Sequence, residues 1–124
     1  MAKHKTEPRS IDARQFALDC ARIANENKAE DVVVLDLRDR SSIRDYFVIC
    51  TGTADRQMRT IADYIDEHAA KSGQARFNVS GYDQSNWILI DYVDVVIHIF
   101  NTDSRKYYDL ELLWGDAPRV ELRA

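Results

Sequence analysis

The sequence contains few of the residues that disulfide scaffolds and long loops require, and it has no membrane-length apolar run. Only two of its 124 residues are cysteine, two are proline and four are glycine. Cys20 and Cys50 lie far apart in apolar surroundings, which predicts reduced core thiols with neither metal nor redox chemistry. No apolar run approaches the roughly 18 to 20 residues that cross a bilayer, and the first residues lack a secretory apolar core. We therefore expect a cytoplasmic protein without a membrane segment.

A basic excess is also absent. The chain carries 17 basic and 21 acidic side chains, a formal net charge of −4, so direct binding to phosphate backbones is disfavoured. Residues 1–82 hold 13 of each sign, whereas residues 83–124 hold eight acidic and four basic side chains. This acidic last third is also rich in aromatic residues, which makes it a candidate docking surface for a basic protein. The alternative is that its carboxylates only solvate the surface.

The hydrophobic pattern predicts one domain over residues 10–124, preceded by a flexible leader over residues 1–9. Helices are expected over residues 11–26, 54–71 and, following Thr102, 103–114, and strands over residues 32–37, 45–50, 77–79, 87–90 and 95–100. The strand at 77–79 is expected at an edge, and the last two strands form an antiparallel hairpin. Ser10 and Thr53 are the expected N-caps of the first two helices. The predicted fold class is α/β (α+β mixed), a single mixed sheet of about five strands with helices packed on it.

The third helix carries most of the aromatic residues near the C-terminus. Helical spacing is expected to place Tyr107, Leu110, Leu113 and Trp114 on the face that packs on the sheet. Tyr108, Glu111 and Leu112 lie to the side of that face and are expected to be accessible.

No pattern of catalytic residues emerges. Thr51-Gly52-Thr53 lies between a strand and a helix, but a single glycine without a following lysine favours an ordinary corner over a phosphate cradle. The aspartates do not form the i, i+2 pair on one strand that would direct two carboxylates at one metal. His98 is interpreted as a half-buried, hydrogen-bonded residue within a strand. The sequence therefore predicts no catalytic residue, no metal ligand and no cofactor.

Large amphipathic side chains interleave with carboxylates in the last third of the chain. Tryptophan and tyrosine supply much of the binding energy at protein interfaces, so a ring of acids around such residues is typical of a docking surface. The alternative is that each aromatic residue belongs to the core. The cluster consists of Trp87, Tyr92, Tyr107, Tyr108 and Trp114.

Several blocks of the sequence occur in the order in which a known family has them. The blocks are DYFVI at 45–49 followed by TGT at 51–53 and Arg56-Gln57, WILIDY at 87–92 with DVVIHIF at 94–100, and RKYYDLE at 105–111 with Leu113-Trp114. Together they resemble the ribosomal silencing factor family (Iojap/RsfS) over roughly residues 11–118. The resemblance covers nearly the whole domain and does not rest on one short motif.

The resemblance implies a non-catalytic factor that binds the large ribosomal subunit through its protein number fourteen. Such a factor sterically blocks joining of the small subunit and represses translation when nutrients are scarce. It also implies a fold similar to that of nucleotidyltransferases without their active site, and a homodimer when the protein is free. The implied partner-binding residues are Trp87, Ile88, Asp91, Tyr92, Asp94, Tyr108 and Glu111.

One position departs from the family pattern. The family commonly has glycine between the tyrosine and the aspartate of the hairpin turn, where this chain has Val93. Because a β-branched residue strongly disfavours positive φ, we expect a turn that does not require it.

Two other functions remain as alternatives at this stage. A nucleotidyltransferase-like, nucleotide-binding enzyme would use the Gly52 corner and nearby aspartates, but it would need a pair of carboxylates on one face beside that corner. A dimerisation module would use the first helix, whose Ile11, Leu18 and Ile23 fall partly off the main apolar stripe.

Overall fold

The computed structural model describes residues 12–122 as one five-stranded sheet with helices on one face and beside one edge. The leader expected at 1–9 lies outside the described residues. The elements in chain order are α1 (Ala13–Glu26), β1 (Glu30–Asp36), β2 (Tyr46–Thr51), α2 (Asp55–Lys71), β3 (Asn78–Ser80), β4 (Trp87–Asp91), β5 (Val95–Phe100), α3 (Thr102–Tyr108) and α4 (Leu110–Leu113). The sheet order is β1-β2-β5-β4-β3. Among the strand pairs of the described residues, only β2 and β5 run parallel, so the sheet is mixed and the expected fold class is confirmed.

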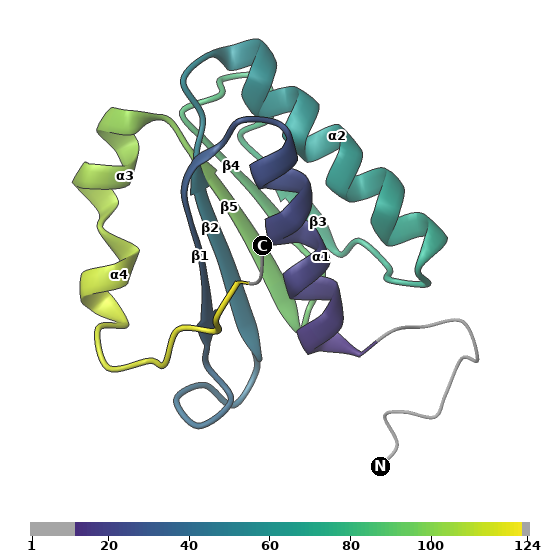
Figure 1. Cartoon of the computed structure of the whole chain (residues 1–124), viewed down its shortest axis with the longest axis vertical. Coiled ribbons are helices and arrows are strands. Elements are labelled where there is room, and N and C mark those ends of the chain that lie inside the picture. The colour runs from purple at the N-terminus through teal and green to yellow at the C-terminus, as the bar shows by residue number, and fades with distance from the viewer. Residues whose placement is uncertain (1–11, 123–124) are drawn as a thin grey trace.

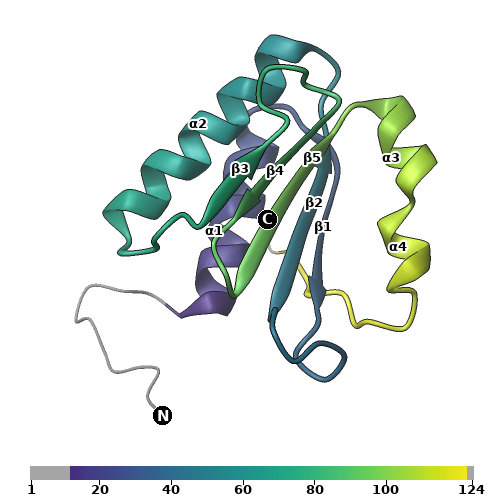
Figure 2. The same cartoon turned by 180° about the vertical axis from the view of Figure 1, so that it is seen from behind.

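The two faces of the sheet are covered differently. Helices α1 and α2 lie across one face, as Figure 1 shows, and the larger hydrophobic core fills the space between them and the strands. Seen from behind in Figure 2, no helix of the described residues crosses β3, β4 and β5. Helices α3 and α4 lie beside β1, where Leu110 and Trp114 pack on a second, smaller core with Leu35, Leu37 and Phe100. One sheet face therefore remains partly open.

The apolar patterns of the first two helices and of the central strand predict their places correctly. On α1 the buried stripe includes Phe16, Cys20 and Ala24, and on α2 it includes Met58 and Ile61. All six residues of β5 are buried, because this strand lies in the middle of the sheet, with the larger core on one face and neighbouring aromatic rings on the other. The expected antiparallel hairpin of β4 and β5 and the edge position of β3 are also confirmed.

The helix N-termini differ from those expected. The N-cap of α1 is Asp12, whose carboxylate accepts a hydrogen bond from Gln15 N at 2.8 Å, whereas Ser10 lies outside the described residues. Helix α2 begins after Ala54, and the prediction of Thr53 as its cap is wrong. Instead, the backbone N–H of Thr53, one residue before the cap, donates to Gln57 Oε1 at 2.7 Å, so a side chain within the helix fixes this corner.

The expected third helix is broken in two. Asp109 adopts the left-handed conformation (φ 46°, ψ 56°), ends α3 and starts α4. The break interrupts the helical periodicity. The buried or exposed face of a residue after 109 therefore cannot be predicted by counting from the residues before it. Tyr107 and Leu113, expected on the buried face, are 81% and 74% exposed. Leu110 and Trp114 do pack on the second core as expected.

The turn between β4 and β5 has the geometry that Val93 was expected to exclude. Val93 has φ 76°, and Asp94 N donates to Tyr92 O at 3.0 Å, which makes a γ-turn with positive φ. A hydrogen bond from Val93 N to Asp91 Oδ1 at 2.7 Å and one from Tyr92 N to Val95 O at 2.9 Å hold the turn in place. The prediction was wrong because these contacts and the hairpin pairing outweigh the local preference of valine.

Replacement of Val93 by glycine is therefore expected to stabilise the protein. Positive φ costs a β-branched residue about 1–3 kcal/mol, and glycine removes this strain while giving back up to about 1 kcal/mol in unfolded-chain entropy. We expect Val93→Gly to raise the free energy of unfolding by about 1 kcal/mol in urea titrations. Val93→Ala keeps a Cβ at positive φ and is the control, expected to gain less. An unchanged or lower stability of the glycine variant would contradict the strained turn.

Candidate docking face

Five aromatic rings gather on the sheet face that α1 and α2 do not cover. Trp87 pairs with Phe100 across β4 and β5, and side chains that alternate along these strands place Trp87, His98 and Phe100 on one face. The Trp87 ring lies 5.0 Å from Phe100 and 4.5 Å from Tyr108 between ring centroids. Phe47 on β2 adds an edge contact to His98 at 4.5 Å. We name this group (Phe47, Trp87, His98, Phe100 and Tyr108) the aromatic patch.

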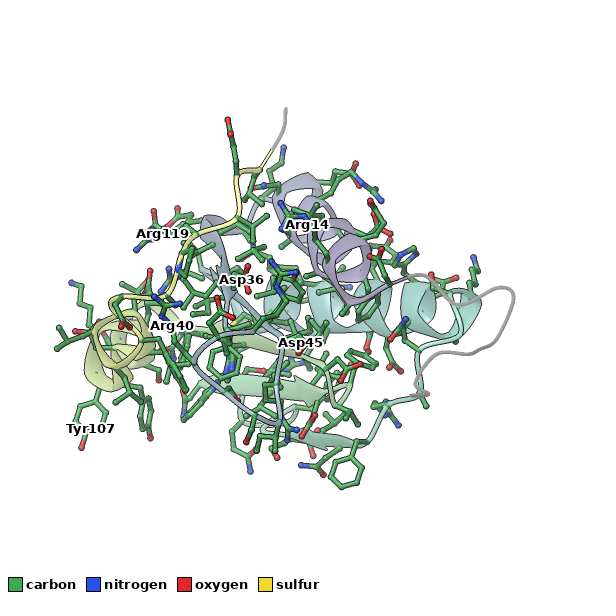
Figure 3. All side chains as sticks on the ribbon, turned by 90° about the horizontal axis from the view of Figure 1, so that it is seen from below. Arg14, Asp36, Arg40, Asp45, Tyr107 and Arg119 are labelled. Carbon is green, nitrogen blue, oxygen red and sulfur yellow. The ribbon has the colours of Figure 1, made fainter. Side chains whose placement is uncertain are left out.

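The side chains of the aromatic patch range in exposure from buried to about half-exposed. Phe100 and His98 are buried, Trp87 and Phe47 are half-buried, and Tyr108 at the end of α3 is 49% exposed. Next to the patch, Tyr107 points away from the molecule, as the view from below in Figure 3 shows. Aromatic side chains on a rigid sheet with one ring face accessible can hold a partner at low entropic cost.

His98 is a structural member of the patch and not a base. Its Nδ1 accepts a hydrogen bond from the indole Nε1 of Trp87 at 3.1 Å. Burial lowers the pKa of His98 to about 3, so the ring is neutral at physiological pH. The expected hydrogen bond is confirmed, while the ring is 3% exposed and thus buried more deeply than expected.

Both carboxylate oxygens of Asp91 are bound by groups within the protein. Oδ1 accepts from Val93 N in the γ-turn, and Oδ2 pairs with Arg44 Nη2 at 2.8 Å. The side chain is buried, so it stabilises the turn and the nearby β1–β2 connection. As both oxygens are occupied, Asp91 offers a partner little free charge.

The other hairpin residues implied by the resemblance lie away from the patch. Ile88 is fully buried in the larger core, and Tyr92 is buried there with its hydroxyl donating to Asp66 Oδ1 on α2 at 2.7 Å. Burial, reinforced by this hydrogen bond, raises the pKa of Tyr92. Asp94 is half-exposed, and its carbonyl accepts from Asp45 N and Tyr46 N. Of the seven residues, the structure brings Trp87 and Tyr108 together in the patch.

Arg105 fixes the helices that carry Tyr108. Its guanidinium forms two bonds of 2.9 Å to the carboxylate of Glu111 and donates to Thr51 Oγ1 at 2.8 Å. It also donates to the carbonyl of Asp31 at 2.9 Å, at a bulge in β1 where Asp31 has φ 51°. Glu111, expected to bind a partner, thus connects α4 to α3. Sequence reasoning missed Arg105 because its contacts on β1 and β2 lie far away in the chain.

The Arg105 contact also sets the charge state of Glu111. The hydrogen bonds from Arg105, helped by the nearby charge of Arg119 at 3.6 Å, lower the pKa of Glu111. A mixed-charge hollow of about 640 Å³ lies beside this pair, lined by Asp31, Val32, Val33, Arg105, Lys106, Asp109, Glu111 and Arg119. Because both signs line it, it has no clear preference for an anion or a cation.

At the Gly52 corner, the backbone N–H groups of Gly52 and Thr53 are already hydrogen-bonded within the protein. The N–H of Gly52 donates to the Phe100 carbonyl at 2.8 Å, and the N–H of Thr53 is bound by Gln57. A Cβ on Gly52 would collide with Cγ of the buried Met58, so this glycine serves close packing of the helix on the strand. Among residues 12–122, no three histidine, cysteine or acidic side chains group as metal ligands. The corner is therefore a packing feature.

The two cysteines are buried and free, as expected. Burial raises the pKa of both thiols, that of Cys50 to about 12, so neither is a ready nucleophile or metal ligand. No helix in the described part of the chain has the length and apolar character that crossing a bilayer demands.

By its fold and its aromatic patch, the protein belongs to the class of mixed α/β domains in which one sheet face is partly open and lined by aromatic residues. The family model described as "ribosomal silencing factor during starvation" matches residues 10–124, so the chain belongs to the ribosomal silencing factor family. This confirms the resemblance found in the sequence blocks.

Individual relatives agree with the family. The ribosomal silencing factor RsfS of Bacillus subtilis is 42% identical over 102 residues, covering 82% of this chain and 86% of the relative. That of Halalkalibacterium halodurans is 46% identical over 98 residues, covering 79% and 84%. The chloroplastic protein Iojap of Zea mays is 36% identical over 110 residues, which cover 86% of this chain but 46% of Iojap.

Solved structures support the same fold. A crystal structure of a Bacillus halodurans protein, 39% identical, superimposes with a TM-score of 0.73 over 88% of this chain and 96% of its own. A Chromobacterium violaceum protein, 24% identical, gives a TM-score of 0.81 over 92% and 94% of the two chains, a likeness of fold alone.

Removal of Arg105 is expected to destabilise the protein strongly. Arg105→Met leaves Glu111 without its main partner and removes the donors to Thr51 and Asp31, so we expect a loss of about 3 kcal/mol in the free energy of unfolding. Arg22→Met on the exposed side of α1 is the matched control, expected to cost no more than about 0.5 kcal/mol. Equal losses in the free energy of unfolding for the two variants would show that Arg105 stabilises the fold no more than an exposed arginine does.

The lowered pKa of Glu111 predicts a pH dependence of stability. A carboxylate with a depressed folded pKa stabilises the protein above its unfolded pKa and loses that contribution as pH falls through the folded value. Glu111→Gln is therefore expected to lower stability most near neutral pH, with a difference from the wild type that shrinks below about pH 4.5. Urea titrations at several pH values measure this difference. A gap that stays constant down to about pH 3 would contradict the assignment.

Proposed function

We propose that the protein binds the large ribosomal subunit through the subunit's protein number fourteen and keeps the small subunit from joining. Its membership of the ribosomal silencing factor family supports a role in turning translation down under starvation. A mouse relative, 27% identical, bears the name "mitochondrial assembly of ribosomal large subunit protein 1", which points to the large subunit. Blocking would be steric, because a factor seated on one subunit only has to occupy the surface that the other needs.

The observation that carries this proposal is the open sheet face with its aromatic patch. Trp87 and Tyr108 are in ring contact, partly exposed, and backed by the buried rings of His98 and Phe100. Rigid aromatic anchors of this kind contribute most of the energy at protein interfaces. We propose Trp87 and Tyr108 as direct contacts, while Asp91 and Glu111 position the turn and the helices around them.

Unpaired carboxylates around the patch suit a basic partner. Among the described residues, Asp94, Asp103 and Asp109 form no ion pair. Asp103 and Asp109 are exposed on or beside α3, next to Tyr108, whereas Asp94 lies at the turn end of the hairpin, away from the patch. Ribosomal proteins are typically basic, so these charges would speed encounter, while the aromatic rings would slow dissociation. Ile88 and Tyr92 lie in the core and support the hairpin from the other face.

The proposal extends to the free protein, which we propose is a cytoplasmic homodimer that acts without a cofactor. Light scattering at several protein concentrations measures the oligomeric state, and a mass of one chain throughout would refute the dimer.

The function is tested by subunit joining. Purified bacterial small and large subunits are mixed at a magnesium concentration that permits association, and the 70S fraction is followed by sucrose-gradient sedimentation. A several-fold loss of 70S particles with added protein, and comigration of the protein with the large subunit, would support the proposal. Undiminished 70S formation at saturating protein would refute it.

Within this assay, two aromatic substitutions are expected to weaken binding. Trp87→Ala removes the central ring of the patch and should cost about 2 kcal/mol of affinity for the large subunit, about 30-fold. Tyr108→Ala should weaken binding in the same direction. Tyr64→Ala on α2 is the matched control, because Tyr64 is also 49% exposed but lies on the helix that covers the opposite face. If all three variants bind alike in co-sedimentation, the patch is not the docking face.

A further inference from the structure

We propose that His98 is a positioning residue that fixes the Trp87 indole in the orientation needed for docking. The proposal rests on the function proposed above, in which Trp87 contacts the large subunit. The two residues lie on neighbouring strands, and the hydrogen bond between Trp87 Nε1 and His98 Nδ1 is 3.1 Å long.

This hydrogen bond determines where the imidazole proton lies. An indole N–H can only donate, so Nδ1 must be the acceptor and the ring proton of the neutral histidine sits on Nε2. Nε2 is buried and has no hydrogen-bond partner among the described residues. The surrounding rings of Phe47, Trp87 and Phe100 offer it no conventional acceptor.

An orphaned buried N–H lowers stability. Leaving such a donor unsatisfied costs roughly 1–3 kcal/mol, whereas an apolar ring of similar shape at this position would carry no such cost. The half-buried Trp87 could turn its own N–H toward water, so the fold does not depend on histidine here. The benefit that remains is the fixed direction of the indole plane.

A fixed indole suits a docking anchor. Immobilising a large side chain during association costs affinity, and a side chain held in place before association avoids this cost. Tyr108 contacts Trp87 from one side and His98 holds its N–H from another, so the ring is restrained at two points. Because the N–H is committed internally, the indole would present only its apolar surface to the partner.

The test is a double-mutant cycle with an independent spectroscopic readout. His98→Phe keeps an aromatic ring but removes the acceptor, and Trp87→Phe removes the donor. Affinity for purified bacterial large subunits is measured for the wild type, both single variants and the double variant. The indole N–H of Trp87 is followed by NMR hydrogen exchange, with Trp114 as the internal reference. His98→Leu repeats the cycle with a smaller side chain in case phenylalanine is too large.

We expect His98→Phe to keep or raise thermal stability, to speed exchange of the Trp87 N–H, and to weaken binding about three- to tenfold. In the Trp87→Phe background the same change should weaken binding no further, because the histidine acts only through the indole. Full affinity of His98→Phe, or an equal loss in both backgrounds, would overturn the proposal.

The two proposals fail differently. If the Trp87 N–H exchanges freely in the wild type, the hydrogen bond is not maintained and the positioning role is refuted, while the docking face can stand. If the N–H is protected but Trp87→Phe and Trp87→Ala bind with full affinity, the docking face itself is refuted, and the positioning role with it.

Discussion

The four hydrogen bonds of the Arg105 guanidinium hold the open side of the molecule together. They connect α3 to the carboxylate of Glu111 on α4, to the hydroxyl of Thr51 on β2 and to the bulged backbone at Asp31 on β1. Helices of seven and four residues are too short to be stable by propensity alone, so this contact and the packing of Leu110 and Trp114 hold them against the sheet. The position of Tyr108 over Trp87 depends on that anchoring.

The two faces of the sheet have different roles. One face, under α1 and α2, holds the larger core and provides rigidity, while the other keeps aromatic rings within reach of solvent. The β4–β5 hairpin contributes side chains to both faces: Ile88 and Tyr92 point into the larger core, and Trp87 lies on the opposite face. A rigid scaffold behind accessible rings is the arrangement that a steric blocking factor needs, since it must hold a partner without chemistry.

Local preference and tertiary context disagree at Val93 and at Asp109. Asp109 directly follows Tyr108 of the proposed docking face, whereas Val93 lies in the turn at the other end of the β4–β5 hairpin from Trp87. Val93 takes a positive φ in a γ-turn that Asp91 holds from one side, and Asp109 takes the left-handed conformation that divides α3 from α4. Natural sequences tend to violate local rules near functional sites, where geometry matters more than strain. The buried Nε2 of His98, which has no hydrogen-bond partner within residues 12–122, belongs to the same pattern.

The sequence by itself determined the five strands, the first two helices and the family, because apolar periodicity and contiguous blocks such as WILIDY are local properties of the chain. Element boundaries, the helix caps and the break at Asp109 were less well predicted, since each depends on contacts beyond its own segment. Only the tertiary structure decided that Ile88 and Tyr92 are buried, that Tyr107 is exposed and that Glu111 binds Arg105. These outcomes depend on side chains distant in sequence, such as Thr51 and Arg105, whose meeting no local pattern encodes.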